Sequence, residues 1–338
     1  MISGKFKRKF YRYLPIIKVF VRIFVICLFA YLLIYYLLSP TFRLLKSITK
    51  ITRKVNLKST NGRVNILLLG AGGANHAAPD LTDSLIFASI ELKGGETVLL
   101  SIPRDIWVDS MKAKINTAYH WGEEKKKGGG LILAKATVSE ILDQPVHYAI
   151  LLDFQGFVKA IDLVGGIDID VERAFDDYKY PIPGMEDAEP EELRYEHIHF
   201  EKGLQHMDGE RVLKYIRSRY AEGEEGTDFA RSKRQQKMLL AFKNKVFSVK
   251  TFLNPKKIKE LVEVFGDSID TDIKEGEYPE FFKLALKLDQ NKLKTVVLNE
   301  DLLYNPPKSE YDGQWILVPK SGNWQEVQEC VKSLISNL

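Results

Sequence analysis

The chain has 338 residues, of which 45% are apolar and 28% charged, with 49 Lys and Arg against 45 Asp and Glu. This composition is that of a globular protein of one or two domains, and it excludes disordered and fibrous classes. The net charge of +4 is unevenly distributed. The first acidic residue is Asp80, so residues 1–79 carry 14 Lys and Arg and no acid, whereas residues 80–338 have a net charge of −10. The two parts are therefore predicted to meet different surroundings.

Residues 19–38 (VFVRIFVICLFAYLLIYYLL) form an apolar run with one charge, Arg22, near its start. At about 1.5 Å per residue, a helix of this length crosses a hydrocarbon core of about 30 Å. The alternatives are a buried core helix and a cleaved signal peptide, but Leu38-Ser39-Pro40 lacks the usual small-residue cleavage pattern. We expect a single-pass anchor at 19–38, preceded by a basic tail at 1–18 and followed by a basic stalk at 39–62. These cations favour anionic lipid headgroups.

The orientation of this anchor is open on charge alone, because similar numbers of Lys and Arg flank both of its ends. Cysteine content does not settle the compartment. Cys27 lies in the apolar run and Cys330 lies near the C-terminus, so an internal disulfide is not expected.

Beyond the stalk, short apolar runs alternate with helical patterns. Buried strands are expected at 64–70, 84–92, 97–102, 147–153 and 167–171, and helices at 130–142, 155–164, 208–218 and 228–247. This order predicts an α/β sheet covered by helices within a domain at 63–250. Residues 251–338 are expected to form an extension packed on it, with helices near 255–265, 279–288 and after Trp324, and a strand at 294–298.

Residues Arg173–Phe200 interrupt this alternation with three prolines and many acids. The stretch is too long for an ordinary connection. We predict a mobile lid or rim beside the functional site.

Two features near the first strands indicate phosphate or metal chemistry. Gly70-Ala71-Gly72-Gly73 follows a strand and could cradle a phosphate, although a flexible loop is an equal interpretation because the next element is a strand and not a helix. Asp80 and Asp83 lie three residues apart at the start of that strand. Two converging carboxylates suit a hard cation such as Mg²⁺, with turn capping as the alternative.

Cations cluster at the end of one predicted helix and the start of the next. The segments are Tyr215-Ile216-Arg217-Ser218-Arg219 and Asp228-Phe229-Ala230-Arg231-Ser232-Lys233-Arg234-Gln235. Asp228 is expected to be the N-cap of the second helix, whose first turns would then carry cations against the helix dipole. An anion bound there would offset that cost, whereas the alternative is a solvated basic helix. Arg104, after the third strand, is aimed at the same edge of the sheet.

In order along the chain, NILLLG, LTDSLIFASI, VLLSIPRD, KINTAYHWG, VHYAILLDFQGFVKAIDLVGGIDIDV, GLQHMDGERVLKYIRSRY and TDFARSKRQQ resemble the LytR-CpsA-Psr family of cell-wall phosphotransferases. The resemblance covers residues 64–247. It implies a three-layer α/β/α sandwich around a mixed central sheet. It also implies a cytoplasmic N-terminus, a catalytic domain outside the membrane, and transfer of a glycopolymer from a polyprenyl-pyrophosphate carrier to peptidoglycan.

Carried onto this sequence, the resemblance implies a pyrophosphate site supported by Mg²⁺ or Mn²⁺. The substrate-binding residues it implies are Arg217, Arg219, Asp228, Arg231, Arg234, Gln235, Lys114 and Asn116, and the catalytic ones are Arg104, Asp83 and Asp105. Asp83 would ligate the metal. The family usually has an aspartate shortly after the glycine of the first strand, where this chain has Ala71-Gly72-Gly73, and Asp80 is the candidate replacement ligand.

Two other classes of function stay open at this stage. One is a hydrolase that uses water as the acceptor. The other is a regulatory or ligand-binding membrane protein, such as a transcriptional attenuator. No nucleic-acid partner is expected, because the basic cluster lies in a net-acidic domain without a nucleic-acid-binding motif.

Overall fold

A mixed six-stranded sheet, ordered β11-β6-β1-β2-β3-β12, forms the centre of the fold in the computed structural model. The structure describes residues 56–73, 78–185, 187–248, 251 and 254–336. The strands are β1 (Arg63–Ala71), β2 (Thr82–Glu91), β3 (Thr97–Ile102), β6 (Tyr148–Asp153), β11 (Ile269–Thr271) and β12 (Leu293–Val297). The β1–β6 and β3–β12 pairs are parallel, and the other pairs are antiparallel.

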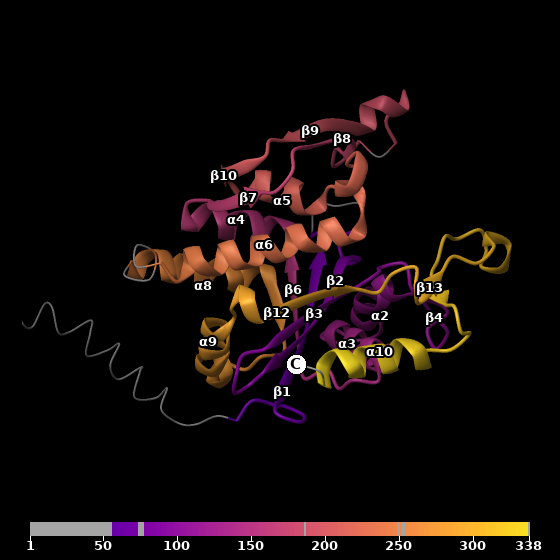
Figure 1. Ribbon diagram of the computed structural model, residues 1–338, viewed down its shortest axis with the longest axis horizontal. Coiled ribbons are helices and arrows are strands. Elements are labelled where there is room, and N and C mark those ends of the chain that lie inside the picture. Colours follow the sequence, from indigo (N-terminus) through magenta and orange to yellow (C-terminus); the bar gives the residue numbers. More distant parts are fainter. Residues whose placement is uncertain (1–55, 74–77, 186, 249–250, 252–253, 337–338) are drawn as a thin grey trace, which may run out of the picture. The chain divides into compact units, whose positions relative to one another are not determined.

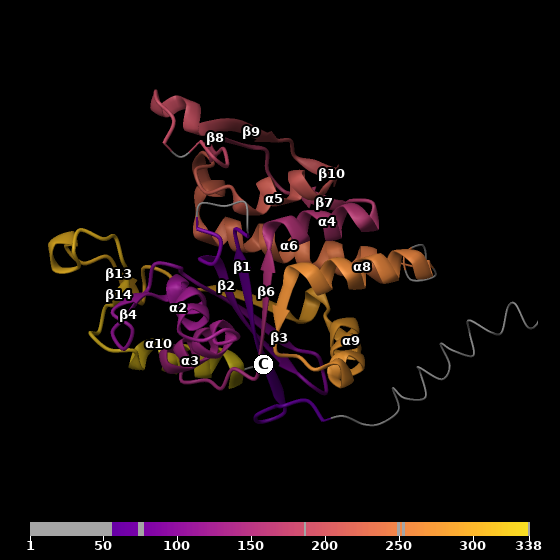
Figure 2. The ribbon, with the colours of Figure 1, turned by 180° about the vertical axis from the view of Figure 1, so that it is seen from behind.

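Helices cover both faces of this sheet, as the sequence predicts. β1 (RVNILLLGA) is apolar on both faces and therefore needs cover on both. Leu67 and Leu69 pack with α2 (Ala118–Lys125), α3 (Gly130–Leu142) and α10 (Gln325–Ser336). On the opposite face, Val64 and Ile66 belong to a second cluster that includes Leu284 of α9 (Tyr278–Lys287). The resulting layers are visible in Figures 1 and 2.

A third cluster lies above that second face. It joins α4 (Phe154–Val164), α5 (Gly209–Arg217), α6 (Asp228–Val246) and α8 (Pro255–Ser268) to two small sheets. One small sheet pairs β7 (Ile167–Val171) with β10 (Gly203–Met207), and the other pairs β8 (Phe175–Pro181) with β9 (Tyr195–Phe200). The strand expected at 167–171 therefore exists but is not part of the central sheet.

The remaining short strands form two hairpins near the end of β3. They pair β4 (Trp107–Val108) with β5 (Ala113–Lys114), and β13 (Leu303–Tyr304) with β14 (Val318–Pro319).

The C-terminal residues complete the central sheet and do not form a separate body. Residues 57–338 are one compact unit, and β11 and β12 are the two edge strands of the sheet. The predicted tail, the predicted span at 19–38 and the stalk up to residue 55 lie outside the described residues. Within the described ranges, no helix combines the length and apolar character needed to cross a membrane.

Candidate active site

A cavity of about 550 Å³ separates the second face of the central sheet from α4, α5 and α6. Its apolar walls come from alternate residues of the strands and from the inner faces of the helices. The sheet supplies Leu68, Ile86, Leu99, Ile150 and Leu152, and the helices supply Phe157, Ile161, Leu213, Ile216, Met238, Leu239 and Phe242. A hydrocarbon chain could occupy this largely apolar space.

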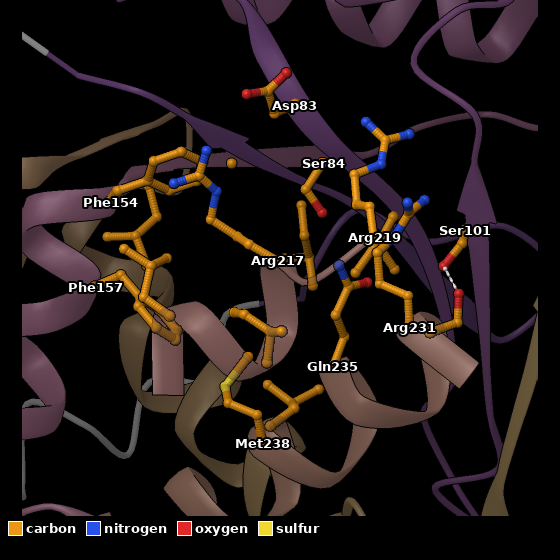
Figure 3. A pocket seen from close by; sticks show the side chains of 18 of the residues that line it. Asp83, Ser84, Ser101, Phe154, Phe157, Arg217, Arg219, Arg231, Gln235 and Met238 are labelled. Atoms are coloured by element: carbon orange, nitrogen blue, oxygen red, sulfur yellow. Dashed lines mark hydrogen bonds between the residues drawn. The ribbon is translucent and has the colours of Figure 1, made fainter. Parts of the chain in front are cut away.

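One end of this cavity is polar, and we call it the mouth. Asp83, Ser84, Ser101 and Arg104 reach it from the sheet, whereas Arg217, Arg219, Arg231 and Gln235 reach it from α5, α6 and the segment between them. Figure 3 shows Asp83 and the three labelled guanidinium groups at this end, with Phe157 and Met238 away from it. Ser232 donates to Ser101 (Oγ to Oγ, 3.0 Å) and so ties α6 to β3. Six of the predicted site residues line the mouth, although the first and last of them are 152 positions apart: Asp83, Arg104, Arg217, Arg219, Arg231 and Gln235.

Arg104 is held by two carboxylates. Its Nη1 donates to Asp83 Oδ1, and its Nε lies 3.5 Å from Asp105 Oδ2. Burial acts to lower the Arg104 pKa, but Asp83 and Asp105 together raise it, so the guanidinium is firmly charged. Lys114 Nζ donates to Asp105 Oδ1 at 2.8 Å. The two carboxylates thus fix the direction of the Arg104 side chain.

Three predicted site residues support Arg104 without lining the cavity. Asp105 is one, and its partner Lys114 is another. The third is Asn116, which is buried and whose N–H donates to the Arg104 carbonyl at 3.3 Å. The structure therefore places these residues behind the mouth, where they act on the position of Arg104.

Arg217 and Arg219 lie at the end of α5 and just beyond it. The Arg217 guanidinium lies 4.3 Å from the centre of the Phe154 ring, and Phe154 opens α4. Stacking on an aromatic face orients the group and leaves its N–H edges available to an anion. The Arg219 side chain is exposed, and within the described residues neither arginine forms an ion pair.

Sequence reasoning missed Asp177, a fully buried residue of β8 that shapes the segment carrying these arginines. Its Oδ2 accepts from Ser218 Oγ at 2.7 Å and from the N–H groups of Arg219 and Tyr220 at 3.2 Å each. Its Oδ1 accepts from the Lys179 N–H at 2.9 Å. One carboxylate therefore fixes the chain direction between Arg217 and Tyr220.

The cations of α6 divide between two faces of the helix. Arg231 and Gln235 line the cavity, as expected for residues four apart. Arg234 is only 2% exposed and does not line the cavity. Its guanidinium donates to the carbonyls of Tyr215, Ser218 and Glu225 and to Glu225 Oε2, all at 2.8–2.9 Å. The structure does not bring Arg234 to the mouth with Arg231 and Gln235, because packing turns its side chain into the protein.

The N-cap of α6 also differs from the predicted one. Thr227, one residue earlier than expected, is the N-cap, and its Oγ1 accepts from the Ala230 N–H at 3.2 Å. Asp228 is the first residue of the helix; its side chain lies outside the described part of the structure, so its predicted role stays a prediction.

The predicted lid is a hairpin. β8 and β9 pair near the two ends of the Arg173–Phe200 stretch, and Lys179, Tyr180, Pro181 and Tyr195 line the cavity. The position beside the site agrees with the predicted rim. Its mobility stays a prediction.

The described residues do not fit the predicted magnesium site. Asp83 is the one acidic side chain among the described residues that line the cavity, and it is already paired with Arg104. Asp80 is exposed, does not line the cavity and faces His120 (Oδ2 to Nδ1, 3.9 Å). No group of three His, Cys, Asp or Glu side chains in the described ranges is arranged to hold a metal. Asp80 does not join Asp83 as a ligand pair.

Comparison with known proteins agrees with the geometry. The model of the LytR_cpsA_psr family matches residues 38–333. Two similar proteins are the polyisoprenyl-teichoic acid–peptidoglycan teichoic acid transferases TagV of Bacillus subtilis and TagU of Oceanobacillus iheyensis. TagV is 29% identical over 74% of this chain and 59% of its own length, and TagU is 30% identical over 70% of this chain and 62% of its own. The chain thus spans about three fifths of these relatives.

The crystal structure of B. subtilis TagV superposes with a TM-score of 0.56 and 27% identity, covering 82% of this chain and 99% of that one. The family match covers most of the chain, and the mouth collects residues from motifs that are distant in the sequence. The chain therefore belongs to the LytR-CpsA-Psr family.

Proposed function

We propose that this protein is a membrane-anchored phosphotransferase. It moves a glycopolymer from a polyprenyl-pyrophosphate carrier to a peptidoglycan hydroxyl and releases polyprenyl phosphate. The N-terminus is cytoplasmic, and the catalytic domain is extracytoplasmic. The printed names of TagV and TagU, which describe transfer of teichoic acid to peptidoglycan, support this proposal.

One observation carries the proposal. The cavity joins an apolar interior to a mouth lined by four arginines, and a polyprenyl pyrophosphate has the same two parts. The hydrocarbon would lie between the sheet and α6, and the pyrophosphate would lie between Arg104 and Arg217. Guanidinium groups bind phosphate oxygens with paired hydrogen bonds, so the mouth is suited to bind an anion such as pyrophosphate.

The reaction follows from that placement. The acceptor hydroxyl oxygen attacks the phosphorus next to the sugar, and the bond from this phosphorus to the bridging oxygen breaks. Polyprenyl phosphate leaves with the bonding electron pair. Phosphoryl transfer depends mainly on positioning and charge neutralisation, which the arginines provide.

The hydroxyl proton needs a base at the mouth. Asp83 is our candidate because it lines the cavity, whereas Asp105 does not. The proton passes from Asp83 to solvent.

The proposal is tested with purified full-length chain, a lipid-pyrophosphate oligosaccharide and peptidoglycan fragments. We expect a covalent conjugate with the wild type and a loss of at least about a hundredfold with Arg217→Ala. Lys233→Ala is the matched control, since Lys233 lies on α6, pairs with Glu172 at 2.6 Å and does not line the cavity.

The outcomes also separate the rival functions. Free sugar phosphate without conjugate would identify a hydrolase. No turnover of the lipid would favour a regulatory or ligand-binding role. Protease accessibility of residues 80–338 on intact cells tests the proposed orientation.

A further inference from the structure

We propose that the mouth neutralises the donor pyrophosphate with arginines alone, and that Arg104, held by Asp83, acts where a divalent cation would otherwise be required. This inference rests on the proposed function. It concerns how the same site holds its substrate.

The one described carboxylate at the cavity is already paired with a cation. A Mg²⁺ ion is usually bound by one or two carboxylates together with substrate phosphates and water. Asp83 is the one acidic side chain that the described residues contribute to the cavity, and its Oδ1 accepts from Arg104 Nη1. A cation on Asp83 would have to displace this guanidinium or lie beside a like charge.

The sequence offers no second carboxylate between β1 and Asp80. Gly72 and Gly73 follow β1, and residues 74–77 are Ala-Asn-His-Ala, so no acid precedes Asp80. Asp153, at the end of the neighbouring strand β6, uses its Oδ1 to accept from the Gly156 N–H at 2.6 Å and caps α4. It is already engaged as a helix cap.

Cations outnumber acids among the described residues that line the cavity. Among the described residues, Arg104, Arg217, Arg219 and Lys179 line the cavity, and Asp83 is the one acid that does so. Within the described residues, Arg217 and Arg219 have no carboxylate partner. A pyrophosphate diester is dianionic at neutral pH, so these two guanidiniums and Arg104 can match its charge. Fixed guanidiniums can then stabilise the charge that develops on the bridging oxygen as its bond to the attacked phosphorus breaks.

Arg104 is the most constrained of the three arginines. Asp83 and Asp105 hold it from two sides, and Lys114 holds Asp105 in turn. A guanidinium held in this way is preorganised, so little reorganisation is needed when charge develops on the substrate. Asp83 accordingly positions a cationic side chain and need not bind a metal ion.

The binding experiment uses farnesyl pyrophosphate as the probe and the full-length chain in detergent, with calorimetry in EDTA and in MgCl₂. We expect dissociation constants that agree within about threefold. Arg104→Ala and Arg217→Ala should each weaken binding in EDTA by about tenfold or more, and Lys233→Ala should leave it unchanged. Binding that falls more than about tenfold when Mg²⁺ is removed would overturn this inference alone. No binding in either buffer would overturn the proposed function as well.

A second measurement does not depend on the substrate. Mn²⁺ is titrated into the chain, and the free ion is followed by electron paramagnetic resonance. We expect no tight site at Asp83. A tight Mn²⁺ site that Asp83→Asn removes would overturn the inference, whereas a site that survives this substitution lies elsewhere and leaves the arginine mouth as proposed.

Discussion

Two charged regions flank α6, and they differ in whether their cations have carboxylate partners. At the mouth, cations exceed acids, and the Arg217 and Arg219 side chains have no carboxylate partner among the described residues. On the other side of the helix, a crevice of about 280 Å³ holds Lys233, Arg234 and Lys237. There each cation has a carboxylate: Glu172 lies 2.6 Å from Lys233 and 2.8 Å from Lys237, and Glu225 lies 2.9 Å from Arg234. Cations without a carboxylate partner, and not cations as such, therefore distinguish the proposed binding surface from the crevice.

The largest effect should come from breaking the matched region. Arg234→Ala removes a buried guanidinium and leaves three carbonyls and Glu225 without their donor. Breaking a buried ion pair from one side costs about 3–5 kcal/mol of unfolding free energy. Urea denaturation of the variant and the wild type measures this. A loss under about 1 kcal/mol would mean that solvent reaches the guanidinium.

Arg217, a cation of the mouth without a carboxylate partner among the described residues, should behave in the opposite way. Arg217→Ala removes a side chain stacked on Phe154 with no ion pair, so we expect a stability change within about 1 kcal/mol. Its transfer rate should nevertheless fall at least about a hundredfold, equivalent to about 2.7 kcal/mol of barrier. Equal losses of stability and rate would erase the contrast with Arg234.

Asp177 connects stability and function, because it is buried in the fold yet shapes the mouth. Asp177→Asn keeps the size of the side chain but faces the N–H groups of Arg219 and Tyr220 with an amide that also donates. We expect a stability loss of about 1–3 kcal/mol and a transfer rate about tenfold lower. A positioning role further predicts weaker donor binding, seen as a raised KM for the lipid. Unfolding with an unchanged KM would show that Asp177 only stabilises the fold.

The smallest effect is the pH dependence of the matched region. Lys233 and Lys237 hold the Glu172 pKa down to about 2, from an ordinary value of 4.5. A depressed carboxyl pKa stabilises the folded state above pH 4.5, and this contribution is lost as pH falls from 4.5 towards 2. The side chain is 44% exposed, so solvent screening limits the effect to under about 1 kcal/mol. Glu172→Gln should flatten this part of the curve of stability against pH, and an unchanged curve would assign it to other carboxyls.

The sequence predicts most of the central sheet, and it singles out the charged residues that the structure brings to the mouth, because apolar strand runs and arginine spacing are local signals. It could not separate Arg231 from Arg234. Both lie in the first turns of α6, and only the packing of Arg234 against Phe175 and Tyr215 decides which one is buried. The metal prediction stays a prediction, but spacing alone could not show that Asp83 accepts a hydrogen bond from Arg104.

The sequence contains a local signal that Asp177 is buried. It lies two residues after Phe175, and the alternation of a strand puts both on the same face, which here is the buried one. The acidic composition of residues 173–200 obscured this alternation and suggested a loop. An acid at a buried strand position needs several hydrogen-bond donors. The sequence therefore predicts that a neighbouring segment supplies N–H or O–H groups to Asp177.

The edge strands β11 and β12 have a consequence for biogenesis. Both come from the last quarter of the chain, yet each completes a sheet whose inner strands are made much earlier. Until residues 269–297 arrive, β6 and β3 present open backbone edges, which are templates for intermolecular pairing. Such long-range pairings slow folding and expose the nascent chain to aggregation. A truncation after residue 250 would therefore leave the sheet incomplete and prone to aggregation.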